Sequence, residues 1–401
     1  MKFWVGQSIS VFGSQFSGLA IPIIAAVLLK ASPIQFGILG FLGSLAFLLF
    51  SLNVGVYVDR RHKRGVMIYA DFGRAVCLAV IPVAYLAGFL SVNLLYVVAF
   101  LTGVLTVFFE ISYQSYVPSL VSRAQLVEAN GKLEATRATS SGFGPFLAGA
   151  VITVVGAPLA AVADTLGYLT SAITLISITR VEEKVERVAR STWHDMREGL
   201  SVVLGDQRLW QIAGCTSTAN LFSSGIFAII VPYFIQRYGF TPLHLGILFA
   251  FASAGAVLGA VVASRLAAWI GVGGAIISSA FVFGLPTAGI YLASGPLAAL
   301  PIGTALFATG FGSTAYNVNQ VSYRQALVKR EVLGRMNATM RFIVTGSQPI
   351  GALMGGILGE ALGYQEAIGL CVIGVSLSFL WVLFSPIRGV KTMPTGHLSG
   401  P

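Results

Sequence analysis

Two acidic residues lie deep inside apolar runs of this sequence, where an ionised side chain is costly. Glu110 interrupts "LTVFFEI" and Asp164 interrupts "AAVADTLGY". A carboxylate in such surroundings must be paired, hydrated or neutralised by a proton. We therefore predict that Glu110 and Asp164 bind and release protons. For Glu110, a permanent ion pair with Arg137 or Arg74 is the alternative.

Other residue types that carry chemistry form no further site in the sequence. Asp71 and Arg74 are three residues apart, the spacing of an ion pair on one helical face. The 4 histidines are scattered and the 3 cysteines lie in apolar runs. Neither set has the arrangement of a catalytic triad, a metal site or a disulfide framework, and no nucleotide-binding loop occurs. The sequence therefore predicts no enzyme, no cofactor and no metal.

Polar residues recur at helical spacing in four otherwise apolar runs, the first and fourth of each half of the chain. At about 100° per residue, they fall on one face of each helix. We predict that these faces line a common chamber, with the following as its principal residues: Ser14, Gln15, Thr106, Tyr113, Asn220, Ser223, Tyr316, Asn317 and Gln320. The alternative is that they only bond neighbouring helices together.

The elements that position these residues follow from composition. Hydrophobic residues make up 56% of the 401 residues and charged residues only 10%, whereas soluble proteins have about 25% charged residues. Runs of about 20 apolar residues span a bilayer as helices. The predicted fold is an all-α polytopic membrane protein with twelve spans, near 3–29, 33–58, 66–90, 92–117, 133–155, 158–180, 209–236, 241–264, 272–294, 296–321, 336–362 and 364–386.

Positive charge alternates from loop to loop. Cations follow spans 2, 4, 6, 10 and 12, whereas only Lys30 and Arg237 lie in the loops of the opposite side. The positive-inside rule then places both termini in the cytoplasm of a cell membrane protein. The net charge of +10 is thus explained by topology, and nucleic acid is not an expected partner.

The chain repeats itself with a period of about 205 residues. "SPIQFGIL" at 32–39 returns as "TPLHLGIL" at 241–248, and Arg137 with Pro145 returns as Arg341 with Pro349. This pattern predicts two pseudo-symmetric six-helix halves. The predicted parts are a first half at 1–180, a linker with a short amphipathic helix at 181–208, a second half at 209–386 and a cytoplasmic tail at 387–401.

Prolines and glycines in the fifth and eleventh spans mark a second repeated feature. Gly144 and Pro145 correspond to the neighbourhood of Pro349. Small residues allow close helix approach, and proline weakens the helical hydrogen-bond ladder. We predict a hinge at these positions, with simple tight packing as the alternative.

The charged loop "GVYVDRRHKRG" at 55–65 resembles the G-x-x-x-D-R-x-G-R-R signature of the major facilitator superfamily, with His62 in place of the usual glycine. The matching residues are Gly55, Asp59, Arg60, Lys63 and Arg64. "FFEISYQSYVPSLVSRAQLVEANG" and "LGRMNATMRF" resemble its macrolide and siderophore efflux branch. The resemblance implies the major facilitator fold and a cytoplasmic gate in which Asp59 meets the start of helix 11, near Arg335. A plain topological anchor is the alternative.

The same resemblance implies a secondary active transporter that works by alternating access. The expected activity is proton-coupled export, as an antiporter, of amphipathic drugs or secreted metabolites. Its expected partners are a small amphipathic substrate, protons and the lipid bilayer, and the expected state is a monomer. A lipid or lysophospholipid transporter of the same fold and a non-transporting membrane scaffold or sensor are the alternatives.

Overall fold

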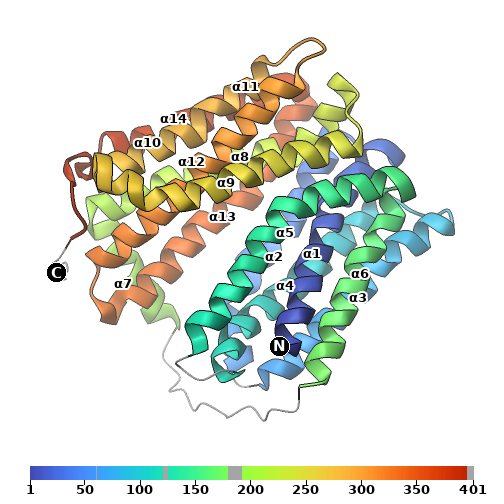
Figure 1. The fold of residues 1–401 in the computed structure, drawn as a ribbon, viewed down its shortest axis with the longest axis horizontal. Coiled ribbons are helices and arrows are strands. Elements are labelled where there is room, and N and C mark those ends of the chain that lie inside the picture. The colour runs from blue at the N-terminus through green and yellow to red at the C-terminus, as the bar shows by residue number, and fades with distance from the viewer. Residues whose placement is uncertain (60, 121–124, 179–191, 395–401) are drawn as a thin grey trace. The chain divides into compact units, whose positions relative to one another are not determined.

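The computed structural model of the chain describes residues 1–59, 61–120, 125–178 and 192–394 (Figure 1). Arg60, residues 181–191 of the predicted linker and residues 395–401 of the tail lie outside this part. The described residues form helices and no strands.

The chain divides into two compact units. One unit comprises Met1–Val188 and Val231–Ala250, and the other comprises Ala189–Ile230 and Phe251–Pro401. The helices before residue 188 are α1 (Lys2–Ile23, extended by a π-helical turn Ile24–Leu28), α2 (Pro33–Asp59), α3 (Lys63–Leu86), α4 (Val92–Leu120), α5 (Leu126–Val155) and α6 (Ala157–Ile176). The later ones are α7 (Thr192–Gly205), α8 (Gln207–Tyr238), α9 (Pro242–Ile270), α10 (Val272–Gly284), α11 (Ala288–Leu292), α12 (Ala299–Leu327), α13 (Arg330–Leu362), α14 (Tyr364–Leu377) and α15 (Leu380–Leu383).

The apolar runs fold as helices because only a helix or a closed barrel satisfies every backbone group in hydrocarbon. Within the described residues, eleven helical segments are long and apolar enough to cross a membrane. Helix α12 is long enough at 29 residues, but its polar stripe lowers its hydropathy. Large apolar side chains such as Val76, Val154 and Ile173 point outward, as a lipid-facing surface requires. The predicted all-α polytopic fold is confirmed.

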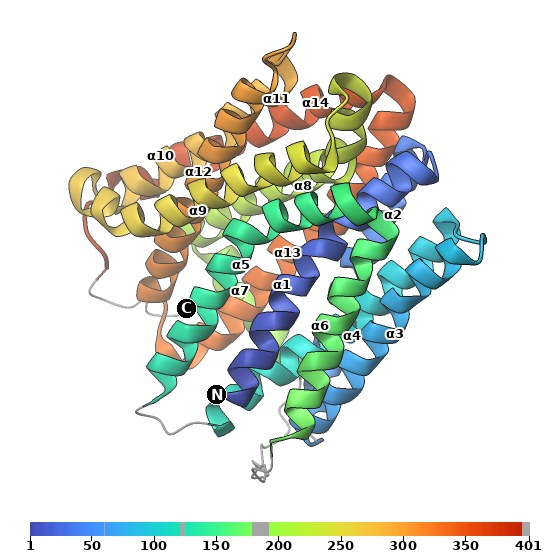
Figure 2. The same cartoon turned by 45° about the vertical axis from the view of Figure 1, so that its right-hand side comes forward.

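In the first unit, α1 packs against α5 and α6, and α3 packs against α4 and α6 (Figures 1 and 2). Glycines permit the closest approach. A Cβ atom on Gly13 of α1 would lie 3.0 Å from the Cα atom of Asp164, and one on Gly167 would lie 3.2 Å from the Cα atom of Ser10. This α1–α6 contact buries Asp164 against a neighbouring helix.

In the second unit, α10 packs against α12 and α14, and α7 packs against α13. Gly199 of α7 leaves no room for a Cβ atom beside the Arg335 carbonyl. Val203 of the same helix is buried in the core, whereas Leu200 and Leu204 are exposed. An amphipathic helix thus lies within the bounds of the predicted linker, and part of its apolar surface is buried by α13.

Two sharp corners occupy equivalent places in the repeat. Gly156 joins α5 to α6 with φ 84°, and Gly363 joins α13 to α14 with φ 87°. Only glycine adopts this backbone conformation without strain. An equivalent glycine therefore follows the fifth predicted span of each half and allows the sharp turn into the sixth.

Candidate functional site

A polar chamber of about 180 Å³ lies among α1, α3, α4, α5 and α6 of the first unit. Four residues predicted from the sequence line it together: Ser14, Thr106, Glu110 and Tyr113. Gln7, Ser10, Thr136 and Arg137 complete most of its polar lining. Gln15, which was also predicted, packs its side chain against Gly144 of α5. The polar stripes of α1 and α4 therefore face the same hollow.

Arg74 lines the chamber, and its guanidinium contacts three other side chains. Its guanidinium carbon lies 4.2 Å from the ring centroids of both Phe109 and Tyr168, close enough for cation–π attraction. The guanidinium also forms an ion pair with Asp71, one helical turn earlier. The ion pair predicted for Asp71 and Arg74 is confirmed.

Asp164 lies behind this pair, on α6. The side chain is buried, and the charges of Arg74 and Asp71 both act on it. Ser17 of α1 faces it, yet the Ser17 hydroxyl and the Asp164 Oδ1 atom both lack a hydrogen-bond partner within the described part of the chain. The structure thus gathers two acids and one cation in the interior of the unit.

The two acids predicted to bind protons have different surroundings. Glu110 is exposed and lines the chamber, whereas Asp164 is buried. Of the two cations considered as partners for Glu110, Arg74 pairs with Asp71, and Arg137 lies 3.9 Å from Glu134. Of the two acids predicted to bind protons, Glu110 is therefore the one in contact with the contents of the chamber.

Hydrogen bonds tie α1 to its neighbours around the chamber. The Gln7 amide donates to the Ser171 hydroxyl of α6 at 2.8 Å. The Trp4 indole donates to the Thr136 hydroxyl of α5 at 3.0 Å, and Ser8 lies 3.2 Å from the same oxygen. Polar residues of α1 therefore serve both predicted purposes, since some line the hollow and others bond helices.

In the second unit, the predicted pathway residues also make contacts between helices. The Thr216 and Tyr316 hydroxyl groups are 2.9 Å apart and join α8 to α12. The Asn220 amide donates to the Val344 carbonyl of α13 at 3.2 Å. Gln320 donates to Asn317 at 3.0 Å within α12 itself, and Ser223 is partly buried on α8. The first two bonds attach the polar face of α8 to α12 and α13.

The predicted hinge positions lie inside continuous helices. Pro145 is within α5 and Pro349 is within α13. Gly144 has no room for a Cβ atom beside Gln15, and Gly351 has none beside the Leu221 carbonyl of α8. Each proline is therefore next to a site where two helices are in close contact.

The charged loop donates hydrogen bonds to the C-terminal end of α6 in the first unit. Arg64 donates from Nε to the Leu175 carbonyl at 2.8 Å and from Nη2 to the Ile176 carbonyl at 2.7 Å. Lys2 donates to the Ser177 carbonyl at 3.1 Å. Cations stabilise the carbonyl end of a helix, so this loop caps α6.

The other predicted gate residues that the structure describes lie where α2 ends and α3 begins. Asp59 is the last residue of α2, Gly55 lies one turn earlier, and Lys63 begins α3. Arg335, on α13 of the second unit, forms an ion pair with Glu198 of α7. This pair attaches α7 to the region that the family resemblance assigns to the gate.

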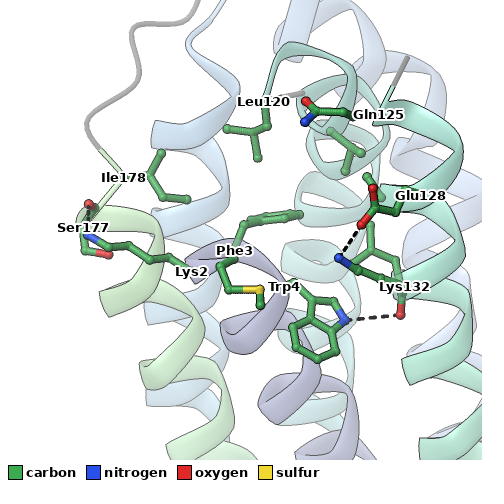
Figure 3. A pocket seen from close by; sticks show the side chains of 13 residues that line it. Lys2, Phe3, Trp4, Leu120, Gln125, Glu128, Lys132, Ser177 and Ile178 are labelled. Atoms are coloured by element: carbon green, nitrogen blue, oxygen red, sulfur yellow. Dashed lines mark hydrogen bonds and ion pairs between the residues drawn. The ribbon is translucent and has the colours of Figure 1, made fainter. Parts of the chain in front are cut away.

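A larger hollow of about 640 Å³ lies at the ends of α1, α4, α5 and α6. Figure 3 shows Phe3 and Leu120 on its apolar walls and polar groups at its edge. Lys132 pairs with Glu128 at 2.6 Å, and its carbonyl accepts a hydrogen bond from Trp4 (Figure 3). The hollow therefore combines an apolar interior with a charged rim.

The aromatic residues around Arg74 were not predicted as site residues. Tyr168 follows Asp164 by four residues, and Phe109 directly precedes Glu110. Four-residue spacing places two side chains on one helical face, so the sequence contained a signal for Tyr168. Nothing in the spacing indicates that α4 and α6 hold the same guanidinium between them.

These features define a class of protein. Membrane-spanning helices with hydroxyl, amide and charged side chains turned into an interior chamber are typical of a membrane transporter. Residues 3–347 match the Major Facilitator Superfamily, and the chain belongs to that family. Its members are transporters and not enzymes, so the chain is a multi-pass membrane transporter of this superfamily.

Two curated relatives are similar over most of the chain. Macrolide efflux protein A of Streptococcus pyogenes is 23% identical over 373 residues, which covers 90% of each chain. Macrolide efflux protein A of Enterococcus faecalis is 23% identical over 320 residues, with coverage of 77% of this chain and 96% of the relative. The resemblance to the macrolide efflux branch is therefore shown across the chain.

Solved structures show the same fold. A bacterial homologue of the iron transporter ferroportin in an inward-facing state has a TM-score of 0.74 at 15% identity, with coverage of 95% of this chain and 97% of that one. A bacterial homologue of the human lysosomal transporter Spinster has a TM-score of 0.72 at 12% identity, with 95% coverage of each chain. These similarities establish the fold of the chain.

Proposed function

We propose that the protein is a proton-coupled exporter of amphipathic compounds, of which macrolides are the first to test. The observation that carries this proposal is the chamber of the first unit, where Glu110 and the Arg74 wall meet hydroxyl and aromatic side chains. The relatives named macrolide efflux protein A support the class of cargo.

The lining of the chamber fits a cargo with both apolar and polar parts. Tyr113 and Phe109 are stacked with their centroids 6.2 Å apart, and they provide apolar area beside the Ser10 and Thr106 hydroxyl groups. Ligand sites commonly combine apolar walls with a few polar groups that fix orientation. In the second unit, we assign the pathway to Asn220, Ser223, Tyr316, Asn317 and Gln320.

Proton coupling is assigned to acids of the first unit. Glu110 meets the chamber and Asp164 is buried behind Arg74. A group that is neutral in one state and ionised in another can exchange a proton across the membrane while the cargo moves the other way. Export as an antiporter follows from such an exchange.

The remaining parts of the proposal concern movement and topology. We assign Asp59 and its loop to a cytoplasmic gate, and Gly144, Pro145 and Pro349 to a hinge between helices. Both termini are placed in the cytoplasm, because the cations of the sequence gather in the loops of one side. The proposed state is a monomer in the cell membrane.

A susceptibility and accumulation experiment tests the function. Cells that lack or overproduce the protein are exposed to erythromycin, and cell-associated drug is measured with and without a protonophore. Overproduction is expected to lower accumulation several-fold, and the protonophore is expected to abolish the difference. Glu134→Gln, on an exposed side chain of α5, is the matched control for expression. Equal accumulation in both strains contradicts macrolide export, and a protonophore-resistant difference contradicts proton coupling.

The larger hollow favours a second candidate, transport of lysophospholipids. Its apolar interior of about 640 Å³ and the lysines at its rim suit an acyl chain with an anionic headgroup. Reconstituted protein would then move a fluorescent lysophosphatidylglycerol between leaflets, and Leu120→Trp would block this movement without changing macrolide export. Movement at the rate of protein-free vesicles excludes this candidate.

A further inference from the structure

We propose that Asp71, Arg74 and Asp164 form a single unit that binds one exchangeable proton, and that this proton is the one exchanged for cargo. This inference rests on the proposed function for the exchange, but the binding of the proton rests on the geometry alone. The three residues are called the buried triad below.

The first step is charge balance. Asp71, Arg74 and Asp164 are 0%, 5% and 1% exposed, so bulk water does not solvate their charges. Arg74 is always protonated in proteins, and one guanidinium balances one carboxylate. If both acids were ionised, the buried triad would carry a net charge of −1 in a bilayer interior, which is costly. One bound proton removes that charge.

The second step is the division of roles between the two acids. Each acid faces one serine hydroxyl, Ser171 for Asp71 and Ser17 for Asp164, and each has one buried oxygen without a hydrogen-bond partner among the described residues. They differ in their ion pairs, because Asp71 pairs with Arg74, whereas none of the ion pairs between described residues includes Asp164. Burial without a cationic partner disfavours the ionised form of a carboxyl group. The proton therefore belongs on Asp164.

The third step is the charge environment of Asp164. From α3 it meets Asp71 and Arg74, and on its own helix it meets Tyr168. From α1 it meets the neutral Ser17. The remaining charged or titratable groups, across the chamber, are Glu110, Tyr113 and Arg137. Only Arg74 is both buried and cationic, so its position decides whether Asp164 is neutral.

The fourth step is the connection between the buried triad and the chamber. Arg74 lines the chamber, and its guanidinium rests on Phe109, which stacks on Tyr113. A cargo molecule that displaces these rings also displaces the guanidinium. If the displaced guanidinium opens the buried triad to the chamber, the Asp164 O–H bond breaks and Glu110 passes the proton on to water. Arg74 is then shared between the Asp71 and Asp164 carboxylates, and water and cargo in the chamber solvate the remaining negative charge. Arg74 is thus a positioning residue for proton release.

Infrared pH-difference spectra of the purified full-length protein in lipid nanodiscs test the binding of the proton. The wild type is expected to show the carbonyl band of one buried protonated carboxyl group. Asp164→Asn and Asp71→Asn are each expected to remove the band, because the remaining acid is balanced by Arg74. Arg74→Gln leaves two acids without a cation and is expected to double the band. Glu134→Gln, on an exposed side chain of α5, is the control and should leave the band unchanged.

Three outcomes overturn the binding of the proton. The first is absence of the band in the wild type, which needs no variant to fold. The second is its persistence in both single Asn variants. The third is its loss when NaCl replaces choline chloride at constant pH, which would mean that sodium balances the charge. None of these outcomes bears on whether the protein exports macrolides.

Proton release on cargo binding tests the exchange. Erythromycin is added to weakly buffered protein with a pH indicator, and about one proton per transporter is expected from the wild type and none from Asp164→Asn. If the band behaves as expected but Asp164→Asn still concentrates cargo against a pH gradient, the exchange role is wrong and the proton is static. If the band is present but no variant or wild type exports macrolide, the proposed function fails and the proton site stands.

Discussion

Arg74 lies against Tyr168, with its guanidinium carbon 4.2 Å from the centroid of the tyrosine ring. The same carbon lies 4.2 Å from the centroid of the Phe109 ring, and the ion-pair partner of Arg74 is Asp71. Removal of one member of a buried ion pair costs about 3–5 kcal/mol, since the other charge is left unpaired. Arg74→Ala is therefore expected to lower the free energy of unfolding by that amount.

A double variant separates the charge effect from lost packing. Asp71→Asn combined with Arg74→Gln removes both charges and is expected to recover at least half of the loss. Thermal unfolding in detergent measures the stability of Arg74→Ala and of the double variant. Arg137→Ala, an exposed arginine of the chamber rim, is the control and is expected to stay within about 0.5 kcal/mol of the wild type. An equally unstable double variant would show that packing, and not charge, dominates at Arg74.

Glu110→Gln tests the acid that meets the chamber. The glutamine has the same size but cannot release a proton, so efflux driven by a pH gradient is expected to be abolished. Binding of erythromycin, measured by equilibrium dialysis, should stay within about threefold, or less than about 0.7 kcal/mol. Gradient-driven efflux at the wild-type rate would exclude Glu110 from coupling.

Asp59→Ala tests the proposed cytoplasmic gate. If Asp59 holds the cytoplasmic side closed, its loss favours the inward-open form. A cysteine introduced as Ser14→Cys, in a chain without Cys77, Cys215 and Cys371, is then expected to react several-fold faster with a cytoplasmic thiol reagent. Glu128→Ala, an exposed acid of α5, provides the comparison. An unchanged labelling rate counts against the gate and favours a topological anchor.

The hydroxyl pair of Thr216 and Tyr316, 2.9 Å apart, is expected to stabilise the contact of α8 with α12. Polar bonds between membrane helices contribute about 0.6 kcal/mol on average, up to about 1.7. A double-mutant cycle with Thr216→Val and Tyr316→Phe should give a coupling energy in that range. Transport assays on the same variants show whether the pair also serves the pathway. Zero coupling would mean that the bond contributes nothing to stability.

The surroundings of Asp206 predict that the free energy of unfolding depends on pH in the acid range. Partial burial tends to raise the pKa of its carboxyl group. Hydrogen bonds from the Arg208 side chain and from the Arg208 and Leu209 backbone amides at the start of α8 outweigh that effect and lower the pKa overall. A group whose folded pKa is lowered stabilises the fold above its unfolded pKa of about 3.9, and this contribution is lost as the pH falls through the folded value.

Asparagine can still accept the capping hydrogen bonds but lacks the negative charge that attracts Arg208 and the start of α8. Asp206→Asn is therefore expected to lower the free energy of unfolding by about 0.3–1 kcal/mol at pH 7. The difference from the wild type should shrink as the pH falls below about 4 towards the lowered folded pKa, because the wild-type carboxyl group then becomes protonated and loses its charge. Thermal unfolding between neutral and acid pH measures this convergence. Glu134→Gln, on an exposed side chain, should show no such pattern. A constant difference at every pH would contradict the assignment.

The sequence by itself determined the membrane-spanning helices and which side chains share a helical face. Apolar runs of spanning length leave the backbone no alternative to a helix, and the fixed helical rotation puts Thr106, Glu110 and Tyr113 on one face. It also determined the Asp71–Arg74 pair, because both residues lie within one turn of α3.

Only the tertiary structure decided which faces meet. Asp164 joins Asp71 and Arg74 because Gly13 and Gly167 let α1 and α6 approach closely and α6 packs on α3. The rings of Phe109 and Tyr168 reach one guanidinium from different helices. Packing of small residues selects such contacts, and helical periodicity along one segment does not specify the partner helix. A buried charge cluster therefore emerged where the sequence had indicated separate residues.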